Sequence, residues 1–166
     1  MIFNNIKKIF HINIIFPVFI FILDRVSKIY VINLSKVSFD TELFSSKCLN
    51  ITLIWNEGIA FGIFSAIHGL WYNLLTIAIV LIAIVILIMS IRQVGAQKYF
   101  LLIVFGGALG NLYDRIFFKA VPDFIDLHVG DFHWFIFNIA DIFITFGVIM
   151  LILLEILPFN KNYEKK

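Results

Sequence analysis

The stretch that most constrains this chain is the uncharged run from Leu70 to Ile91, LWYNLLTIAIVLIAIVILIMSI. At a rise of about 1.5 Å per residue, a helix of this length crosses the ~30 Å hydrocarbon core of a bilayer. The whole chain has the same character, because 61% of its 166 residues are hydrophobic and only 14% are charged. Soluble domains contain about 45–50% apolar residues. The sequence therefore predicts a membrane protein rather than a water-soluble fold.

Four apolar stretches are long enough to span the membrane, and residues 1–166 are expected to form a single membrane-embedded domain. The predicted spans are 12–34, 70–91, 99–118 and 134–157. The first span resembles the apolar part of a secretory signal peptide. Charged and bulky residues follow it where a peptidase needs small ones, so we expect it to remain. In the third span, Gly106 and Gly110 have the spacing that lets helix backbones approach closely.

Lysine and arginine residues outside the spans favour one side of the membrane. The two termini and the loop between the second and third spans carry seven of them, and the other two loops carry three. The seven are Lys7, Lys8, Arg92, Lys98, Lys161, Lys165 and Lys166, and the three are Lys36, Lys47 and Lys119. The positive-inside rule then places both termini in the cytoplasm. A formal net charge of +2 is too small to indicate a nucleic-acid partner.

The first outer loop, residues 36–68, is long for a connection. Residues 49–55 (LNITLIW) alternate with the period of a β-strand, and Gly58 and Gly62 in the following NEGIAFG segment indicate a turn or a close backbone approach. We expect a small β-sheet in this first extracytoplasmic loop. The second outer loop, 119–133, is short and acidic. The predicted fold class is thus an all-α membrane protein of four transmembrane helices with this one β element.

Several polar residues lie inside predicted spans, where charges are costly and mark candidate functional sites. Those that share a helical face are Asp24 with Lys28, then Asn111 with Asp114 and Arg115, then Asn138 with Asp141. The spacing of Asp24 and Lys28 predicts a local ion pair that lowers the cost of burying both charges. Asp141 considered alone could also be a polar group that orients the helix bundle.

Asp123 follows the third span, and Asp141 lies about two turns into the fourth, so both can reach the same depth near the outer interface. Asp123 alone, after Pro122, is more typical of a turn or a helix cap. Two aspartates that meet in a low-dielectric site cannot both ionise easily, so they share one proton. One carboxylate can then act as a base and the other as an acid.

Other kinds of catalytic centre find little support in the sequence. His128 and His133, with Asp126 and Asp131, suggest a metal site, but the metal-binding HExxH motif is absent. No G-x-S-x-G motif indicates a serine nucleophile. Cys48 is the only cysteine, so no internal disulfide can form. We therefore expect neither a metal nor a cofactor.

Five motifs in order resemble those of the lipoprotein signal peptidase family, also called signal peptidase II. They are D-x-x-x-K at 24–28, N-x-G-x-A-F at 56–61, GGALGNLYDR at 106–115, VPDFID at 121–126 and FNIAD at 137–141. The sequence departs from the family pattern at Arg25 and Ser27, where Gln and Thr are common. It also departs at Phe135, which replaces a frequent proline, and at Ile142, where serine is common. Both candidate aspartates are retained.

The resemblance implies an aspartyl endopeptidase of the bacterial cytoplasmic (inner) membrane with its active site near the outer face. It implies removal of the signal peptide from a prolipoprotein, immediately before a cysteine that carries diacylglycerol, with membrane lipid as the surroundings and a monomer as the expected state. The catalytic positions fall on Asp123 and Asp141. Positions that contact substrate fall on Asn56, Gly58, Asn111, Arg115 and Asn138. Positions that support the architecture fall on Asp24, Lys28 and Asp114.

A small four-helix proton-coupled transporter or channel is the alternative, with Asp114, Arg115 and Asp141 as a proton or ion relay. Such a relay needs polar residues through the full thickness of the membrane. Residues 146–154 of the last span are apolar, and the polar groups cluster toward the outer side. A purely structural subunit held together by Gly106 and Gly110 would leave the paired aspartates unexplained.

Overall fold

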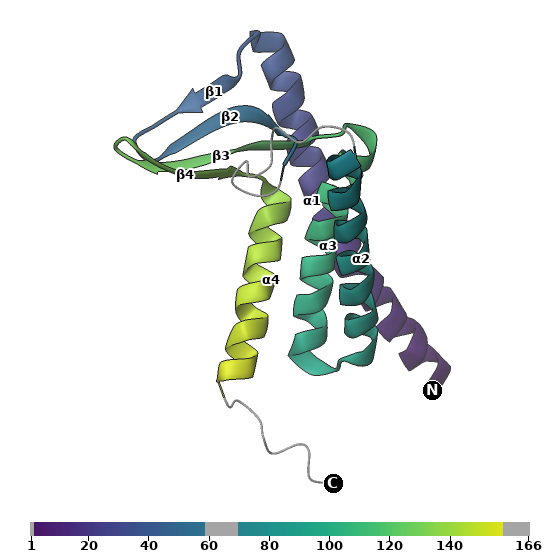
Figure 1. Cartoon of the computed structure of the whole chain (residues 1–166). Helices are drawn as coiled ribbons and strands as arrows, with labels where there is room; N and C mark the ends of the chain where they lie inside the picture. The colour runs from purple at the N-terminus through teal and green to yellow at the C-terminus, as the bar shows by residue number, and fades with distance from the viewer. Residues whose placement is uncertain (1, 59–69, 158–166) are drawn as a thin grey trace.

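The computed structural model describes residues 2–58 and 70–157, in which long helices stand together below a small sheet (Figure 1). The helices are α1 (Ile2–Ser38), α2 (Leu70–Arg92), α3 (Gly95–Phe117) and α4 (Ile139–Ile156). The strands are β1 (Glu42–Ser45), β2 (Leu49–Asn56), β3 (Val121–Val129) and β4 (Phe132–Phe137). Most of the turn predicted at 58–62 lies outside the described residues.

Three of the described helices are long and apolar enough to cross a membrane: Tyr72–Arg92, Gly95–Phe117 and Ile139–Ile156. They correspond to the second, third and fourth predicted spans. The predicted start of the fourth span at Trp134 was wrong, because the apolar residues before Asn138 belong to strand β4. Helix α1 contains the first predicted span, but its crossing of the membrane stays a prediction.

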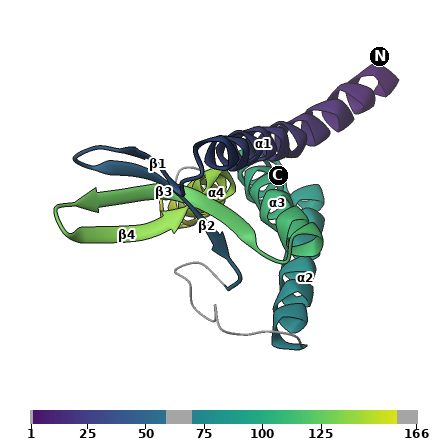
Figure 2. The ribbon, with the colours of Figure 1, turned by 90° about the horizontal axis from the view of Figure 1, so that it is seen from above.

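Helix α3 packs against each of the other three helices (Figure 2). Its glycines explain the closeness of this packing. A Cβ atom at Gly106 would lie 2.8 Å from the Cα atom of Pro17 in α1, and one at Gly110 would lie 2.5 Å from Oδ2 of Asp24. The close approach predicted for this pair is confirmed. Gly107, between them, does the same for α4, where a Cβ would lie 2.6 Å from a backbone carbonyl oxygen.

The four strands form one antiparallel sheet in the order β1-β2-β3-β4. The strand predicted at residues 49–55 is confirmed as β2. The prediction that the sheet belongs to the first outer loop alone was wrong, because the second loop supplies β3 and the β3–β4 hairpin. Residues 121–124 are all buried, so this strand lacks the alternation that marks a half-exposed strand. Its partner in β2 is also distant in sequence.

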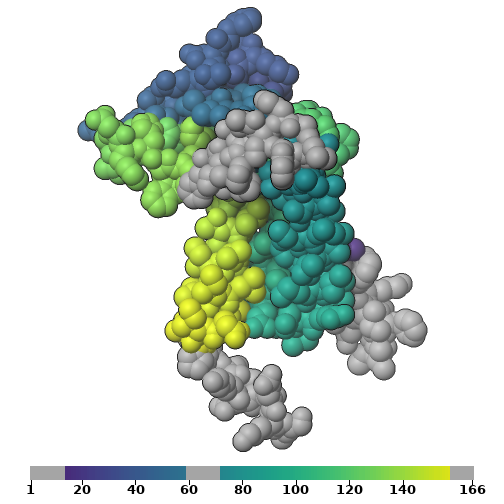
Figure 3. Space-filling view, in the orientation of Figure 1, coloured from purple at the N-terminus to yellow at the C-terminus, as the bar shows by residue number. Residues whose placement is uncertain are grey.

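The sheet lies at one end of the helices and extends past α4 (Figures 1 and 3). Val31 of α1, Leu53 of β2 and Phe124 of β3 form a buried cluster that joins the sheet to the helices. The chain passes from α3 into β3 and from β4 into α4. The buried cluster therefore holds in place the residues at these two connections, where the helices meet the sheet. That junction holds the candidate site.

Candidate active site

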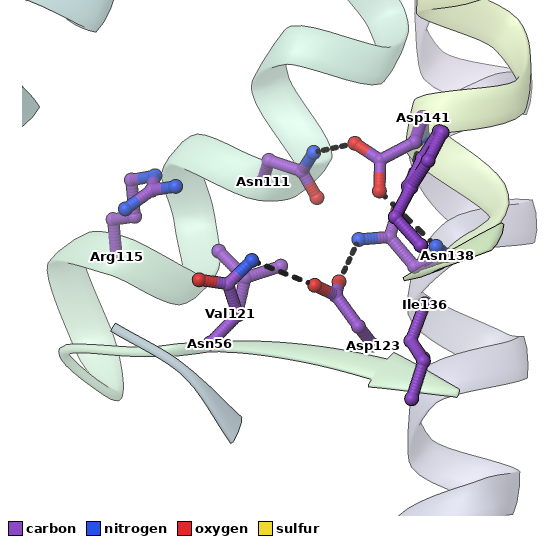
Figure 4. Close-up of a pocket in the computed structure, with 9 residues that line it drawn as sticks. Asn56, Asn111, Arg115, Val121, Asp123, Ile136, Asn138 and Asp141 are labelled. Atoms are coloured by element: carbon purple, nitrogen blue, oxygen red, sulfur yellow. Dashed lines mark hydrogen bonds between the residues drawn. The ribbon is translucent and has the colours of Figure 1, made fainter. Parts of the chain in front are cut away.

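A cavity of about 30 Å³ lies where the sheet meets α3 and α4 (Figure 4). A buried water needs roughly 10–15 Å³, so the cavity has room for water. Its lining combines two carboxylates, three amides and one guanidinium with three apolar side chains. The lining residues are Asn56, Asn111, Arg115, Val121, Asp123, Phe135, Ile136, Asn138 and Asp141. The structure thus brings together both predicted catalytic positions and four of the five predicted substrate positions.

Asp123 lies near the start of β3 and is only 4% exposed. Its Oδ1 accepts a hydrogen bond from Asn138 Nδ2 at 2.6 Å, and its Oδ2 accepts one from Asn56 Nδ2 at 2.8 Å. Burial, reinforced by the charge of Asp141, raises the pKa of Asp123 to about 6, although both amide donors act in the opposite direction. Asp123 is therefore a carboxyl that can hold or release a proton near neutral pH.

Asp141 lies in the first turn of α4 and forms a capping box with Asn138. The backbone N–H of Asn138 donates to Asp141 Oδ2 at 3.1 Å, and the N–H of Asp141 donates to Asn138 Oδ1 at 3.1 Å. The other carboxylate oxygen accepts a hydrogen bond from Asn111 Nδ2 of α3 at 2.7 Å. A helix N-terminus also favours negative charge. The cap thus begins the helix and aims this carboxylate at the cavity.

The three amides that bind the aspartates are each held at the oxygen end. Asn56 Oδ1 accepts from the N–H of Gly58 at 2.9 Å, and Asn111 Oδ1 accepts from Lys28 Nζ at 2.9 Å. Asn138 Oδ1 accepts the backbone N–H in the first turn of α4 described above. Because each oxygen already faces a donor, each NH₂ group must face a carboxylate. The amides are oriented before any substrate arrives.

A cluster of four charged residues, three of them fully buried and one partly buried, lies behind the cavity, between α1 and α3. The predicted ion pair of Asp24 and Lys28 is confirmed, with 2.9 Å between Oδ2 and Nζ. Arg25 binds Asp114 through two hydrogen bonds of 2.5 and 2.6 Å and contacts Asp24 at 2.9 Å. Asp24 Oδ1 also accepts the N–H of Ala140, at the start of α4. The sequence reasoning missed Arg25, although an arginine inside a predicted span was a signal for such a partner.

Arg115 connects the cavity to the residues that follow β2. Its Nη2 donates to the carbonyl oxygen of Gly58 at 2.6 Å, and Tyr72 O–H donates to the carbonyl oxygen of Arg115 at 3.2 Å. Among the described residues, its buried Nη1 finds no hydrogen-bond acceptor. Gly58 does not line the cavity itself, and it reaches the site through this guanidinium. A buried donor without a partner is costly, so Nη1 is well placed for an acceptor on a ligand.

The two histidines considered as metal ligands lie on β3 and β4, outside the cavity lining. Their rings stack on each other with centroids 4.9 Å apart, and His133 Nδ1 lies 2.8 Å from Asp126 Oδ2. Within 2–58 and 70–157, no group of three or more His, Cys, Asp or Glu side chains is arranged to hold a metal ion. The chemistry available in the cavity is that of carboxyl groups, amides and one guanidinium.

Comparison with known proteins gives a consistent match over most of the chain. The family model for signal peptidase (SPase) II matches residues 16–157. The lipoprotein signal peptidase of Pelagibacter ubique is 48% identical over 98% of this chain and 97% of its own length. The enzyme of the same name from Anaplasma phagocytophilum is 42% identical over 81% of this chain and 85% of its own length.

A solved structure described as a bacterial membrane enzyme has the same fold. It superposes with a TM-score of 0.68 at 31% identity, over 94% of this chain and 93% of that one. The family match includes α2, α3, α4 and the whole sheet, and therefore every residue that lines the cavity. Sequence, fold and family model agree over the same region, and the chain belongs to the signal peptidase II family of bacterial membrane proteases.

Proposed function

We propose that this protein is an aspartyl endopeptidase that removes the signal peptide from prolipoproteins, with Asp123 and Asp141 as its catalytic pair. The observation that carries the proposal is the arrangement of two buried aspartates around one small polar cavity, each oriented by amide donors. Family membership supports signal-peptide removal, and the cavity supports the two-carboxylate chemistry.

The pair would act on a water molecule and a peptide carbonyl together. The ionised carboxylate takes a proton from water as the water oxygen attacks the carbonyl carbon, and the protonated partner donates its proton to the carbonyl oxygen. The tetrahedral intermediate then collapses, and the C–N bond breaks as the leaving amine receives a proton from the pair. The raised pKa of Asp123 supports a site that keeps one shared proton near neutral pH. The reaction needs no metal.

Substrate is held by the polar groups around this pair. Arg115 Nη1, which lacks an acceptor among the described residues, is assigned to a peptide carbonyl of the substrate. Asn56, Asn111 and Asn138 bind peptide groups through the amides that orient the two carboxylates. Gly58 is tied to Arg115, so substrate binding and the chain that follows β2 are coupled.

The membrane arrangement is part of the same proposal. Helix α1 crosses the bilayer with the three spans described above, and its buried charges are neutralised within the cluster of two acids and two bases. Both termini lie in the cytoplasm, so the sheet and the cavity lie near the outer face of the bacterial inner membrane. The protein acts as a monomer. Its substrate carries diacylglycerol on a cysteine, so the substrate is embedded in lipid and reaches the cavity sideways from the bilayer.

A cleavage assay in detergent tests this function. A diacylglyceryl-modified prolipoprotein is incubated with wild type, Asp123→Asn or Asp141→Asn, and loss of the signal peptide is followed as a gel shift. Each substitution keeps the side-chain size and removes its acid–base capacity, so cleavage should be abolished while thermal unfolding shows a folded protein. Asp131→Asn, an exposed acid in the β3–β4 turn, is the matched control and should cleave normally.

Cleavage retained by either aspartate variant would remove that residue from the pair. A folded wild type that leaves the substrate intact, under conditions in which a related peptidase cuts it, would contradict the proposed function. Proton flux in liposomes would then test the transporter alternative.

A further inference from the structure

Lys28 contacts three oxygens although it is completely buried. Its Nζ lies 2.9 Å from Asp24 Oδ2, 2.7 Å from Asp114 Oδ2 and 2.9 Å from Asn111 Oδ1. An ammonium group has three N–H donors, so each has an acceptor. Two of the acceptors are carboxylates that need a cation. The third is a neutral amide, which leads directly to the candidate catalytic pair.

Through that third contact, Lys28 on α1 orients the amide of Asn111, which in turn binds Asp141 on α4. Asn111 Nδ2 donates to Asp141 Oδ1 at 2.7 Å, while the oxygen of the same amide is held by Lys28. If the amide turned over, its oxygen would face a carboxylate and its NH₂ would face an ammonium. Hydrogen bonding to a cation also polarises the amide and strengthens the donation from its N–H. Lys28 therefore fixes the only favourable orientation of Asn111.

The neighbouring cation does a different job within the same cluster. Arg25 binds both oxygens of Asp114 and contacts Asp24. Within the described part of the chain it forms no hydrogen bond or ion pair with Asn111 or Asp141. With Arg25 present, the two carboxylates and two cations balance. Both cations neutralise the two carboxylates, but of the two only Lys28 also contacts Asn111. A comparison of variants at Lys28 and Arg25 therefore separates the amide contact from the neutralisation of charge.

We propose that Lys28 is a positioning residue for peptide hydrolysis, which orients the catalytic carboxylate of Asp141 through the amide of Asn111. This inference rests on the proposed function, and it assigns Lys28 a role beyond support of the fold. Misplacement of a catalytic group by about 1 Å costs on the order of 10²-fold in rate. The loss should therefore fall on kcat, while KM changes little.

Loss of the Lys28 charge should also move the pH profile. The charged groups around the pair are Asp24, Arg25 and Lys28 from α1, and Asp114 and Arg115 from α3. The charge of Lys28 lowers the pKa of Asp123, so its removal lets the pair keep the shared proton to higher pH. The alkaline limb of the pH profile should therefore move to higher pH in a variant that lacks this charge.

The test compares Lys28→Met with Arg25→Gln in the full-length protein, using rates corrected for the folded fraction measured by thermal unfolding. Both variants should unfold at lower temperature. Only Lys28→Met should lose about 10²-fold in kcat and shift the alkaline limb, whereas Arg25→Gln should keep the kcat and pH profile of wild type. If Lys28→Met fails to fold, the double variant Lys28→Met/Asp24→Asn decides, because it removes one charge of each sign.

Equal kcat and unchanged pH profiles for all folded variants would overturn the proposal and leave Lys28 as a purely structural residue. A similar loss of kcat in Arg25→Gln would also overturn it, because the effect would then come from the cluster as a whole. Failure of the wild type to cleave would instead contradict the proposed function, so the two failures are distinguishable.

Discussion

Gly107→Ala should damage the candidate site without touching any residue that lines it. A Cβ atom at this position would lie 2.6 Å from the carbonyl oxygen of Ala140 and 2.8 Å from Cγ1 of Ile144. Ordinary contact begins at about 3.4 Å, and the carbonyl belongs to a helix backbone, so it cannot rotate away. Helices α3 and α4 must therefore separate by roughly 0.8 Å at this point, which is a typical overpacking response.

This separation acts on the hydrogen bond between Asn111 and Asp141. Asn111 lies one turn beyond Gly107 on α3, and Asp141 follows Ala140 on α4. The Nδ2–Oδ1 distance of 2.7 Å would lengthen to about 3.5 Å, beyond the usual range for an N–H···O hydrogen bond. Overpacking should cost about 1–3 kcal/mol of stability. Displacement of the carboxylate should lower the cleavage rate roughly 10- to 100-fold.

Initial rates of prolipoprotein cleavage and thermal unfolding in the same detergent measure the two effects. Gly147→Ala is the matched control, because its Cβ would lie 2.5 Å from Cγ2 of Val104 and 3.0 Å from the carbonyl oxygen of Phe100. It crowds the same two helices away from the aspartates, so it should lower stability but keep most of the activity. The reasoning fails if Gly107→Ala keeps the wild-type rate, or if Gly147→Ala loses as much.

Asp24→Asn should lower stability by about 3–5 kcal/mol, because it leaves Lys28 buried with one carboxylate fewer. Thermal unfolding measures this loss. Unchanged stability with lost cleavage would contradict the structural role of Asp24. The pKa of Asp123 in the folded protein, about 6, lies above its ordinary value of 3.8, so protonation favours folding. The contribution of Asp123 to stability should therefore fall by up to about 3 kcal/mol in total as the pH rises from 3.8 to about 6, and by roughly half of that above about pH 5. Comparison of wild type with Asp123→Asn at about pH 5 and about pH 7.5 checks this sign, since the variant should depend less on pH. A chelator such as EDTA should leave cleavage unchanged, and inhibition reversed by added metal would indicate a metal site.

The long helices were the most predictable part of the fold, because hydrophobic length alone identifies them. The run at 70–91 matches α2 to within one residue. The start of α4 was placed too early because WFIF, residues 134–137, continues the apolar run although it forms part of β4. The capping-box pair of Asn138 and Asp141 was a better signal for the helix start than hydrophobicity.

The second half of the sheet could not be read from local sequence. Strand β3 pairs with β2, so that Asn56 lies opposite Val121, and this contact links residues far apart in the chain. The residues of β3 alternate weakly because helices and neighbouring strands bury both of its faces at 121–124. The amide partners of Asp123, Asn56 from β2 and Asn138 from the start of α4, come from other elements, so local sequence did not predict them either.

The predicted site residues fall together for a reason that the sequence only partly contained. Spacing on α3 placed Asn111 and Arg115 on one helical face, and spacing on α4 placed Asn138 with Asp141. Which atoms donate and which accept depends on contacts between elements, such as Lys28 from α1 with Asn111. The bidentate pairing of Arg25 with Asp114 likewise joins two helices, so no local pattern could reveal it.

The position of Asp141 in the last helix has a consequence for the biosynthesis of the protein. A nascent chain that ends after β3 already contains Asn56 and Asp123, but it lacks both Asn138 and Asp141. The polar cavity closes only when α4 has been synthesised and has docked against α3. Partly inserted chains therefore carry Asp123 without its proposed catalytic partner. Proteolytic activity would begin with the completed bundle, so an incompletely assembled chain would not cleave its neighbours during insertion.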